Sequence, residues 1–207
     1  FDSDSNKVVI VYQDAGNSTY GTSIVGTVSG TAISFGTAVV FEAAGTQHTS
    51  CAFDSDANKV VISYQDNGNS NYGTGIVGTV SGTAISFGTA VVYEAAATEY
   101  TSCAFDSDSN KVVLAYRDSA NSDYGTAIVG TVSGTSISYG AAVVYNSDTT
   151  VNVSATFDSN ANKVVISYRD QGNPGTPGLG YGTSSVGTVS GTAISFVTAV
   201  LFGSNDT

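Results

Sequence analysis

Short runs in which apolar and polar residues alternate, separated by clusters of Gly, Ser, Asn and Asp, fill the whole chain. In one representative stretch, the β-rich runs 49–54 and 59–65 flank the polar segment 55–58, and the runs 73–80 and 83–93 flank the pair Ser81-Gly82. Asx side chains bond their own backbone in turns, and a two-residue Ser-Gly link between β-branched runs favours a tight hairpin. The pattern therefore predicts two hairpins, joined by a polar loop at 66–71.

The same pattern is written four times, in copies that occupy residues 1–52, 53–104, 105–156 and 157–207 of a single repeat domain. Copies one and two differ at nine of 52 positions, so they must fold alike. Four antiparallel strands in about 50 residues are typical of a propeller blade. We therefore expect an all-β fold, a β-propeller built from four four-stranded antiparallel blades. Half of a larger ring and part of an open repeat array are the alternatives. The core expected in copy two comprises Phe53, Ile62, Tyr64, Ile76, Val80, Ile85, Phe87, Val91 and Tyr93.

The seam between the last copy and the first is incomplete. Copy four carries five extra residues in its polar loop and stops at repeat position 46, so the front half of one strand is missing there. A four-bladed ring would close with residues 203–207 beside Phe1. Alternatively, the free edge pairs with a neighbouring chain or with further blades, because an unpaired edge promotes association. The lack of methionine and the start inside a repeat favour an excerpt of a longer polypeptide or a processed product.

Composition and charge narrow the classes of partner. Forty-one per cent hydrophobic residues, with twelve Tyr and nine Phe, suffice for a core. Six basic residues against seventeen acidic ones give a net charge of -11, which argues against nucleic acid because no basic surface exists to release counterions. No apolar run reaches the roughly 20 residues of a membrane-spanning helix, so we expect no membrane insertion.

The most metal-like feature is an alternation of carboxylate and amide residues at the start of each copy, which resembles the beginning of a calcium loop. The sequence then runs directly into Lys and a strand, without the glycine and glutamate that such a loop needs. A hairpin turn with Asx bonds is therefore the preferred interpretation, and a weak Ca²⁺ site is the alternative; no other cofactor is expected. The candidate ligands are Asp2, Asp4, Asn6, Asp54, Asp56, Asn58, Asp106, Asp108 and Asn110, with Asp158, Asn160 and Asn162 in copy four.

A second motif combines an aromatic ring, a carboxylate and an amide in the polar loop of each copy. Such side chains suit a sugar site, because the ring stacks on a pyranose face while the polar groups bind its hydroxyls. Four copies would add avidity. The alternative is that the tyrosines pack between blades and that Asp and Asn shape the loop. The candidate ligand-binding residues are Asp14, Asn17, Tyr20, Asp66, Asn69, Tyr72, Asp118, Asn121, Tyr124, Asp170, Asn173 and Tyr181.

The sequence offers few residue combinations that could support catalysis. The single histidine, His48, corresponds to Tyr100 in the next copy and is interpreted as a surface strand residue, so no Ser-His-Asp set forms around it. A ring of equivalent aspartates lacks the asymmetry that separates an acid from a nucleophile in glycoside hydrolysis. We expect no enzyme. Cys51 and Cys103 share one repeat position and are expected to be free thiols, because matched strands hold them too far apart for a disulfide.

The segments FDSDSNKVVIVYQD and YGTSIVGTVSGTAISFG resemble the tandem repeats of about 52 residues in long, uncharacterised surface or virion proteins of marine bacteria and their phages. The resemblance covers the whole chain and implies propeller-like modules at a cell surface or virion, without catalytic residues to transfer. Copy four departs from the pattern at Pro174, Pro177, Asn160 and Val197, which suggests a terminal blade or a modified rim.

Together these observations predict an extracellular, non-catalytic recognition or display module of a cell surface or virion. Glycans are the first ligand class, bound at several blade rims, and surface proteins are the second. Self-association through the incomplete seam strand is a further expected contact. The competing functions are a structural spacer of a fibre or adhesin without a ligand and, less favoured, a glycan-active enzyme.

Overall fold

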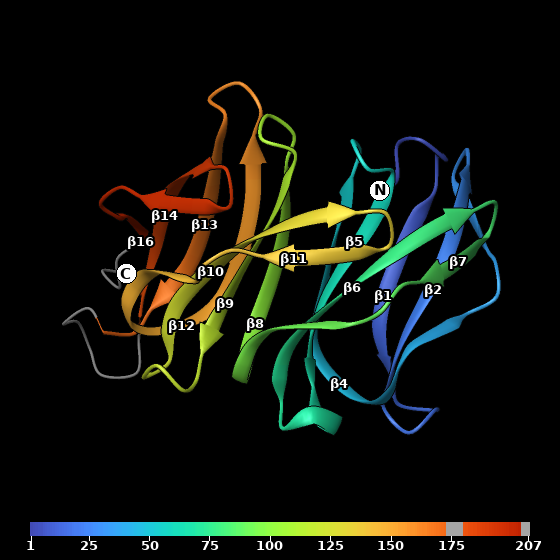
Figure 1. Ribbon diagram of the computed structural model, residues 1–207, viewed down its shortest axis with the longest axis horizontal. Coiled ribbons are helices and arrows are strands. Elements are labelled where there is room, and N and C mark those ends of the chain that lie inside the picture. The colour runs from blue at the N-terminus through green and yellow to red at the C-terminus, as the bar shows by residue number, and fades with distance from the viewer. Residues whose placement is uncertain (173–179, 204–207) are drawn as a thin grey trace.

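A computed structural model describes residues 1–172 and 180–203, and it is built almost entirely of antiparallel strands. Figure 1 shows each copy contributing the same series of elements. The strands are β1 (Val8–Asp14), β2 (Tyr20–Ser29), β3 (Ala32–Phe35), β4 (Val39–Asp54), β5 (Lys59–Asp66), β6 (Tyr72–Ser81), β7 (Ala84–Phe87), β8 (Val91–Asp106), β9 (Lys111–Asp118), β10 (Tyr124–Ser133), β11 (Ser136–Tyr139), β12 (Val143–Asp158), β13 (Lys163–Asp170), β14 (Tyr181–Ser190), β15 (Ala193–Phe196) and β16 (Val200–Gly203). A short 3-10 helix, η1 (Asn67–Asn69), follows β5.

Copy two illustrates how one sheet is assembled. The second half of β4 pairs with β5, β5 pairs with β6, and the near half of β6 pairs with the start of β8. The far half of β6 pairs instead with β7 through the tight link at Ser81 and Ala84. The sheet of copy two therefore has four antiparallel strands and a short projecting arm, which is made by β6 and β7.

Two strand predictions need correction. The run 83–93 is not one strand, because residues 88–90 lie between β7 and β8 and the two strands pair with different halves of β6. The second correction is that the strand does not end at residue 93, where the predicted run ends. β8 runs on for 16 residues and changes partner from β6 to β9 on its way into the next sheet.

The apolar core lies between consecutive sheets. One cluster joins Val61, Val77 and Tyr93 of copy two to Val112, Leu114, Tyr116, Ile128 and Ile137 of copy three, and the neighbouring pairs of copies meet in the same way. The expected core residues Ile62, Tyr64, Ile76, Ile85 and Tyr93 are buried, and Phe53, Val80, Phe87 and Val91 are half-buried against the clusters. Because both faces of an inner sheet are covered, Val61 and Val77 are fully buried as well.

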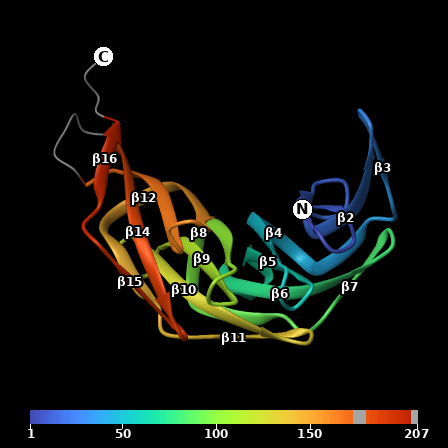
Figure 2. The same cartoon turned by 90° about the horizontal axis from the view of Figure 1, so that it is seen from above.

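The four sheets follow one another along an open arc, with the first and last copies at its two ends (Figure 2). The expected closure of a four-bladed ring is therefore wrong for the described residues, among which β1 pairs only with β2 and β16 only with β14. The physical reason lies at the seam, where copy one has only the isolated bridge Asp2–Lys7 in place of an inner strand. β1 is thus an edge strand, and residues 204–207 lie outside the description.

No helix in the described part of the chain is long and apolar enough to cross a membrane.

Candidate functional site

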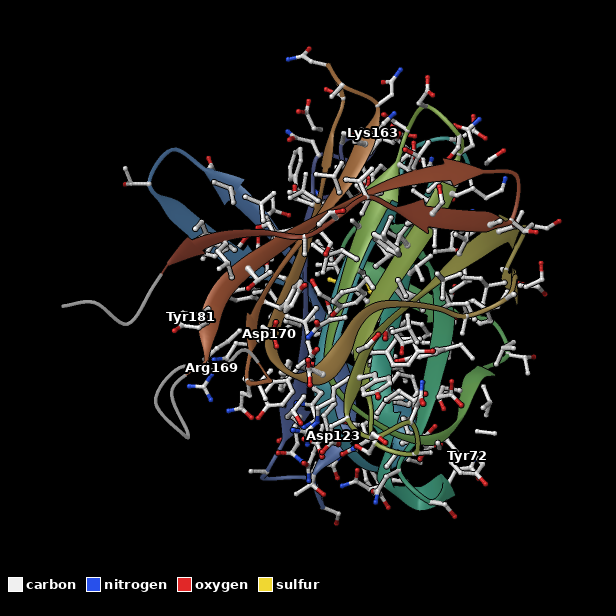
Figure 3. All side chains as sticks on the ribbon, turned by 90° about the vertical axis from the view of Figure 1, so that its left-hand side faces the viewer. Tyr72, Asp123, Lys163, Arg169, Asp170 and Tyr181 are labelled. Carbon is white, nitrogen blue, oxygen red and sulfur yellow. The ribbon has the colours of Figure 1, made fainter. Side chains whose placement is uncertain are left out.

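Each sheet presents two ends with different chemistry. We call the end that carries the hairpin turns 3–6, 55–58, 107–110 and 159–162 the turn end, and the end that carries the loops 15–19, 67–71, 119–123 and 171–172 the loop end. Figure 3 shows Lys163 at the turn end, whereas Tyr72, Asp123, Arg169, Asp170 and Tyr181 lie toward the loop end. The two predicted sites therefore lie at opposite ends of the molecule.

The candidate calcium residues at the turn end form hairpin turns. The Asp54 Oδ1 atom accepts hydrogen bonds from the backbone N–H groups of Asp56, at 3.1 Å, and Ala57, at 2.9 Å. Asp2, Asp106 and Asp158 accept the equivalent pairs of bonds in their copies. Asn6, Asn58, Asn110 and Asn162 adopt φ values of 53° to 55°, the left-handed conformation that Asn tolerates in turns.

The remaining oxygens of these turns do not gather around a common centre. Asp4, Asp56 and Asp108 are exposed, and the ammonium group of Lys59 donates to the backbone carbonyls of Ala57 and Asn58. In the described ranges, no group of three or more His, Cys, Asp and Glu side chains is arranged to hold a metal ion. The geometry at this end is that of an Asx-bonded turn closed by a lysine.

The aspartates at the loop end also have a structural role. Asp66 Oδ1 accepts from the N–H groups of Gly68 and Asn69, at 2.9 and 3.2 Å, and so caps η1. Asp118, Asp14 and Asp170 accept similar bonds, and three of the four aspartates are buried. These carboxylates shape the loop, which leaves only part of their hydrogen-bonding capacity for a ligand.

The other members of the predicted sugar motif are more accessible. Asn17, Asn69 and Asn121 are exposed, and Tyr20, Tyr72, Tyr124 and Tyr181 are half-buried; Asn173 lies outside the described residues. The structure therefore brings the three residue types to the same loop in each copy. It presents the amides and one part of each ring to solvent.

A group of charged and aromatic side chains that was not predicted lies at the same end, between copies one, two and three. This loop-end cluster consists of His48, Glu99, Tyr100, Arg117 and Asp123, all of them half-buried. Arg117 Nη2 lies 2.5 Å from Glu99 Oε2, and Arg117 Nε lies 3.5 Å from Asp123 Oδ1. The guanidinium carbon lies 5.2 Å from the centre of the Tyr100 ring, which itself lies 5.2 Å from the His48 ring.

The protonation state of the cluster follows from its surroundings. His48 Nε2 lies 4.0 Å from Glu99 Oε2, but burial lowers the pKa of His48, and the positive charge of Arg117 acts in the same direction against the pull of Glu99. The imidazole is therefore neutral at physiological pH, and Glu99 is paired with Arg117. The cluster offers one neutral ring pair and one arginine that is paired with two carboxylates, which suits binding and supplies no nucleophile with a general base.

A β-bulge places the aromatic members of this cluster. The register of β4 against β5 shifts between Gln47 and Ser50, and the register of β8 against β9 shifts between Glu99 and Ser102. His48, Tyr100 and the equivalent Asn152 have φ values of 49° to 54°, which non-glycine residues seldom adopt. Bulges redirect side chains, and here the bulge turns a different side chain outward in each copy.

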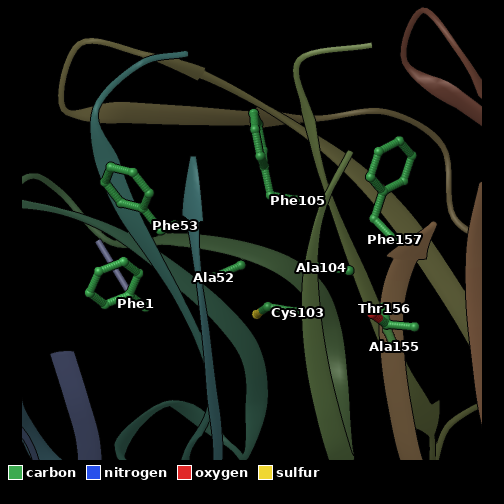
Figure 4. A pocket seen from close by; sticks show the side chains of 9 residues that line it. All are labelled: Phe1, Ala52, Phe53, Cys103, Ala104, Phe105, Ala155, Thr156 and Phe157. Atoms are coloured by element: carbon green, nitrogen blue, oxygen red, sulfur yellow. The ribbon is translucent and has the colours of Figure 1, made fainter. Parts of the chain in front are cut away.

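A separate pocket, lined mainly by apolar side chains, opens at the turn end (Figure 4). It has a volume of about 310 Å³, and its lining consists of Phe1, Ala52, Phe53, Cys103, Ala104, Phe105, Ala155, Thr156 and Phe157. Cys103 is the only described lining residue with a titratable side chain, and burial raises the pKa of its thiol to about 12. The thiol therefore stays protonated and unreactive. Cys51 and Cys103 are both free, as predicted.

Several of the positions at which the copies differ in polar character meet at the loop end. Repeat position 13 is Gln13, Gln65, Arg117 or Arg169, and positions 19, 47 and 48 supply the remaining members of the loop-end cluster. Position 45 belongs here too, since a Cβ atom added to Gly45 would lie 3.0 Å from the Thr19 hydroxyl and 3.5 Å from Asn67. This variation between copies was the signal that could have identified the cluster from the sequence.

No protein-family model matches the chain, and no curated protein matches its sequence.

Proposed function

We propose that this chain is a non-catalytic recognition module that binds its ligand at the loop end. One observation carries the proposal: repeat positions 13, 19, 47 and 48, which meet at the loop end, exchange charged, amide and aromatic residues between copies, whereas the core positions of Val60, Val61, Val77 and Ile85 hold the same residue in all four copies. Loops on a rigid scaffold are where binding residues concentrate. A spacer without a ligand does not require charged, amide and aromatic side chains to be exchanged at these four positions.

Carbohydrate is the ligand class that we propose first. The half-exposed tyrosines and the His48 and Tyr100 rings provide surfaces on which a sugar ring can stack, and Arg117, Glu99 and the exposed Asn side chains provide directional donors and acceptors. Equivalent loops in neighbouring copies would bind a repeating glycan with avidity. A surface protein is the second candidate, and a strongly acidic chain remains a poor partner for nucleic acid.

We also propose that the four sheets are consecutive blades of a propeller-type repeat, displayed outside a cell or on a virion. Sheet faces packed against one another, with the last strand of one sheet continuing into the first strand of the next, support this architecture. The open arc supports the two alternatives to a closed four-bladed ring, namely part of a larger ring or of an open array.

The structural spacer remains the competing function, because the buried loop aspartates already satisfy backbone N–H groups. A glycan array probed with the full chain distinguishes the two. We expect specific hits that Arg117→Gln and Tyr100→Ala weaken. Arg117→Gln should fold normally, since Gln65 occupies this position in copy two and donates to the Thr98 carbonyl at 2.7 Å.

The matched control is Ser107→Ala at the exposed turn end, which should leave glycan binding unchanged. Absence of hits at high protein concentration would refute carbohydrate binding. Hits that both loop-end variants leave unchanged, but that a substitution in the apolar pocket removes, would move the site to the turn end.

A further inference from the structure

The three internal interfaces follow one packing rule at a glycine. Gly36, Gly88 and Gly140 occupy the same repeat position, directly after the short arm strand. A Cβ atom on any of them would lie about 3 Å or less from the carbonyl carbon and the Cβ of Thr83, Thr135 or Thr192 of the following copy, and closer still to the carbonyl oxygen. The arm of each following copy thus packs on the backbone of the copy before it, and only glycine leaves room.

In copies two to four, one sheet face packs against the preceding copy. In the first copy the same face is exposed. We call this the leading face; it comprises Ile10, Val28, Ile33 and Phe35. Ile33 is 44% exposed, whereas its equivalents Ile85, Ile137 and Ile194 are each 5% exposed. In copies two to four, the preceding copy covers these positions, so the structure shows three times what fits this face.

The fourth copy presents the opposite face, which we call the trailing face, but with a different residue at the decisive position. Val197 stands where the other copies have glycine, and it is 64% exposed. Gly203 also replaces the glutamate whose equivalents, Glu42 and Glu94, accept a hydrogen bond from a tyrosine of the following copy. The other apolar contact residue of this face, Phe202, is retained and is 68% exposed.

We propose that the leading face is a docking site for a repeat unit of this same type that carries glycine at the position of Gly36, and that Val197 closes the trailing face to such docking. The two end faces are therefore not complementary, although the copies are so alike. Two molecules of this chain do not join end to end in the internal geometry, because the Val197 side chain would overlap the Thr31 backbone of the second molecule, as the repeat places it. The Val197 side chain therefore decides which of the two end faces can dock a further repeat unit.

The test creates the missing complement in the full chain. Val197→Gly should allow the trailing face to dock on the leading face of a second molecule, and Val197→Ala, which keeps a Cβ atom, should not. We expect association of the glycine variant with wild type to exceed that of the alanine variant by about 5- to 150-fold, the factor that corresponds to relief of an overpacked contact. Analytical ultracentrifugation at high micromolar concentration measures it.

Substitution of the leading face identifies where the molecules meet. A Val197→Gly, Ile33→Asp double variant has an opened trailing face and a blocked leading face, so with wild type it should form a complex of one to one and no larger species. When the single variant Ile33→Asp replaces wild type in this mixture, the complex should not form. Circular dichroism with an unchanged strand spectrum establishes that each variant is folded.

Two results would overturn the proposal. If folded Val197→Gly stays monomeric when mixed with wild type, the leading face is not a docking site for this repeat. If wild type or Val197→Ala associates as strongly as the glycine variant, Val197 excludes nothing. Should Val197→Gly lose its fold, Gly140→Val tests the same rule inside the chain: it should detach copy four and raise amide hydrogen exchange in β13 and β14, and unchanged exchange would contradict it.

Discussion

Gly88→Val tests the packing between copies two and three. Gly88 donates its N–H to Val77 O at 2.9 Å and lies against Thr135 of the next copy. A Cβ atom at this position would lie 2.9 Å from both the carbonyl carbon and the Cβ of Thr135. The substitution installs in copy two the residue that copy four carries naturally, so the same side chain can be compared in a covered and an uncovered setting.

The magnitude follows from the separation that the new side chain requires. Ordinary van der Waals contact begins at 3.4 Å, so relief of these two contacts alone moves the sheets apart by the difference between 3.4 and 2.9 Å, about 0.5 Å, and the nearer Thr135 carbonyl oxygen requires more. A gap of that size forfeits about a quarter of the dispersion energy of each contact it opens. Overpacking of this kind costs about 1–3 kcal/mol, and the two additional methyl groups of Val place the loss near 3 kcal/mol. For a chain of this length, the melting temperature should fall by about 6–12 °C.

Urea unfolding followed by circular dichroism measures this loss. Because the stability of a repeat protein is a sum of unit and interface contributions, we expect Gly88→Val to broaden or split the transition as copies one and two separate from copies three and four. Val197→Ala is the control at the same repeat position, and its effect should stay within about 0.5 kcal/mol. A Gly88→Val protein as stable as wild type would show that the sheets do not meet at Thr135.

Three further predictions concern contacts between sheets. Tyr116→Phe should lower the free energy of unfolding in urea by about 1–2 kcal/mol, because the hydroxyl donates to Glu94 at 3.1 Å; Tyr12→Phe, whose ring has no such glutamate among the described residues, should change little. Desolvation raises the pKa of Glu42 and Glu94, so the folded state binds their protons more tightly than the unfolded chain. Wild type should therefore gain stability relative to the double Glu→Gln variant as the pH falls from neutrality toward 4.5, and a loss over that range would contradict the shift. Gly75→Ser should cost about 1–3 kcal/mol, because a side chain there meets the Tyr139 hydroxyl; a double-mutant cycle with Tyr139→Phe should remove most of that cost, since copy one pairs Ser23 with Phe87 in the equivalent positions.

The strands that pair locally could be predicted from the sequence. The run 59–65 and the turn 55–58 agree with β5 and its Asx-bonded turn, because alternation and Asp chemistry act within a few residues. The buried positions were predicted only in part. Val61 and Val77 are as fully buried as Ile62, since the sheet is covered on both sides, and alternation within one strand identifies only one side.

Features that depend on the neighbouring copy were beyond local reasoning. The break between β7 and β8 arises because residues 88–90 pass beneath the arm of copy three. The continuation of β8 was not predicted because its first part pairs with β6 of copy two and its second part with β9 of copy three, so one strand belongs to two sheets. The loop-end cluster was missed for the same reason, because His48, Glu99 and Arg117 come from three different copies and lie together only after the sheets have stacked.

The bulge at repeat position 48 shows why such a repeat can vary at one end without losing its fold. His48, Tyr100 and Asn152 share a left-handed backbone that costs an ordinary residue about 1–2 kcal/mol, and Tyr, unlike Asn and His, is not enriched there. Packing does not explain why this cost is retained for three unrelated side chains, since Asn152 is exposed and the two rings are half-buried. Strained residues persist where the surrounding structure holds them, and they concentrate at binding sites. Here Thr101 donates to the His48 carbonyl, and the Ser50 hydroxyl accepts from the Cys103 N–H at 3.0 Å, so adjoining long strands hold the bulge from the side. These hydrogen bonds do not involve the exchanged side chain, so the residue at repeat position 48 can change without loss of the bonds that hold the bulge.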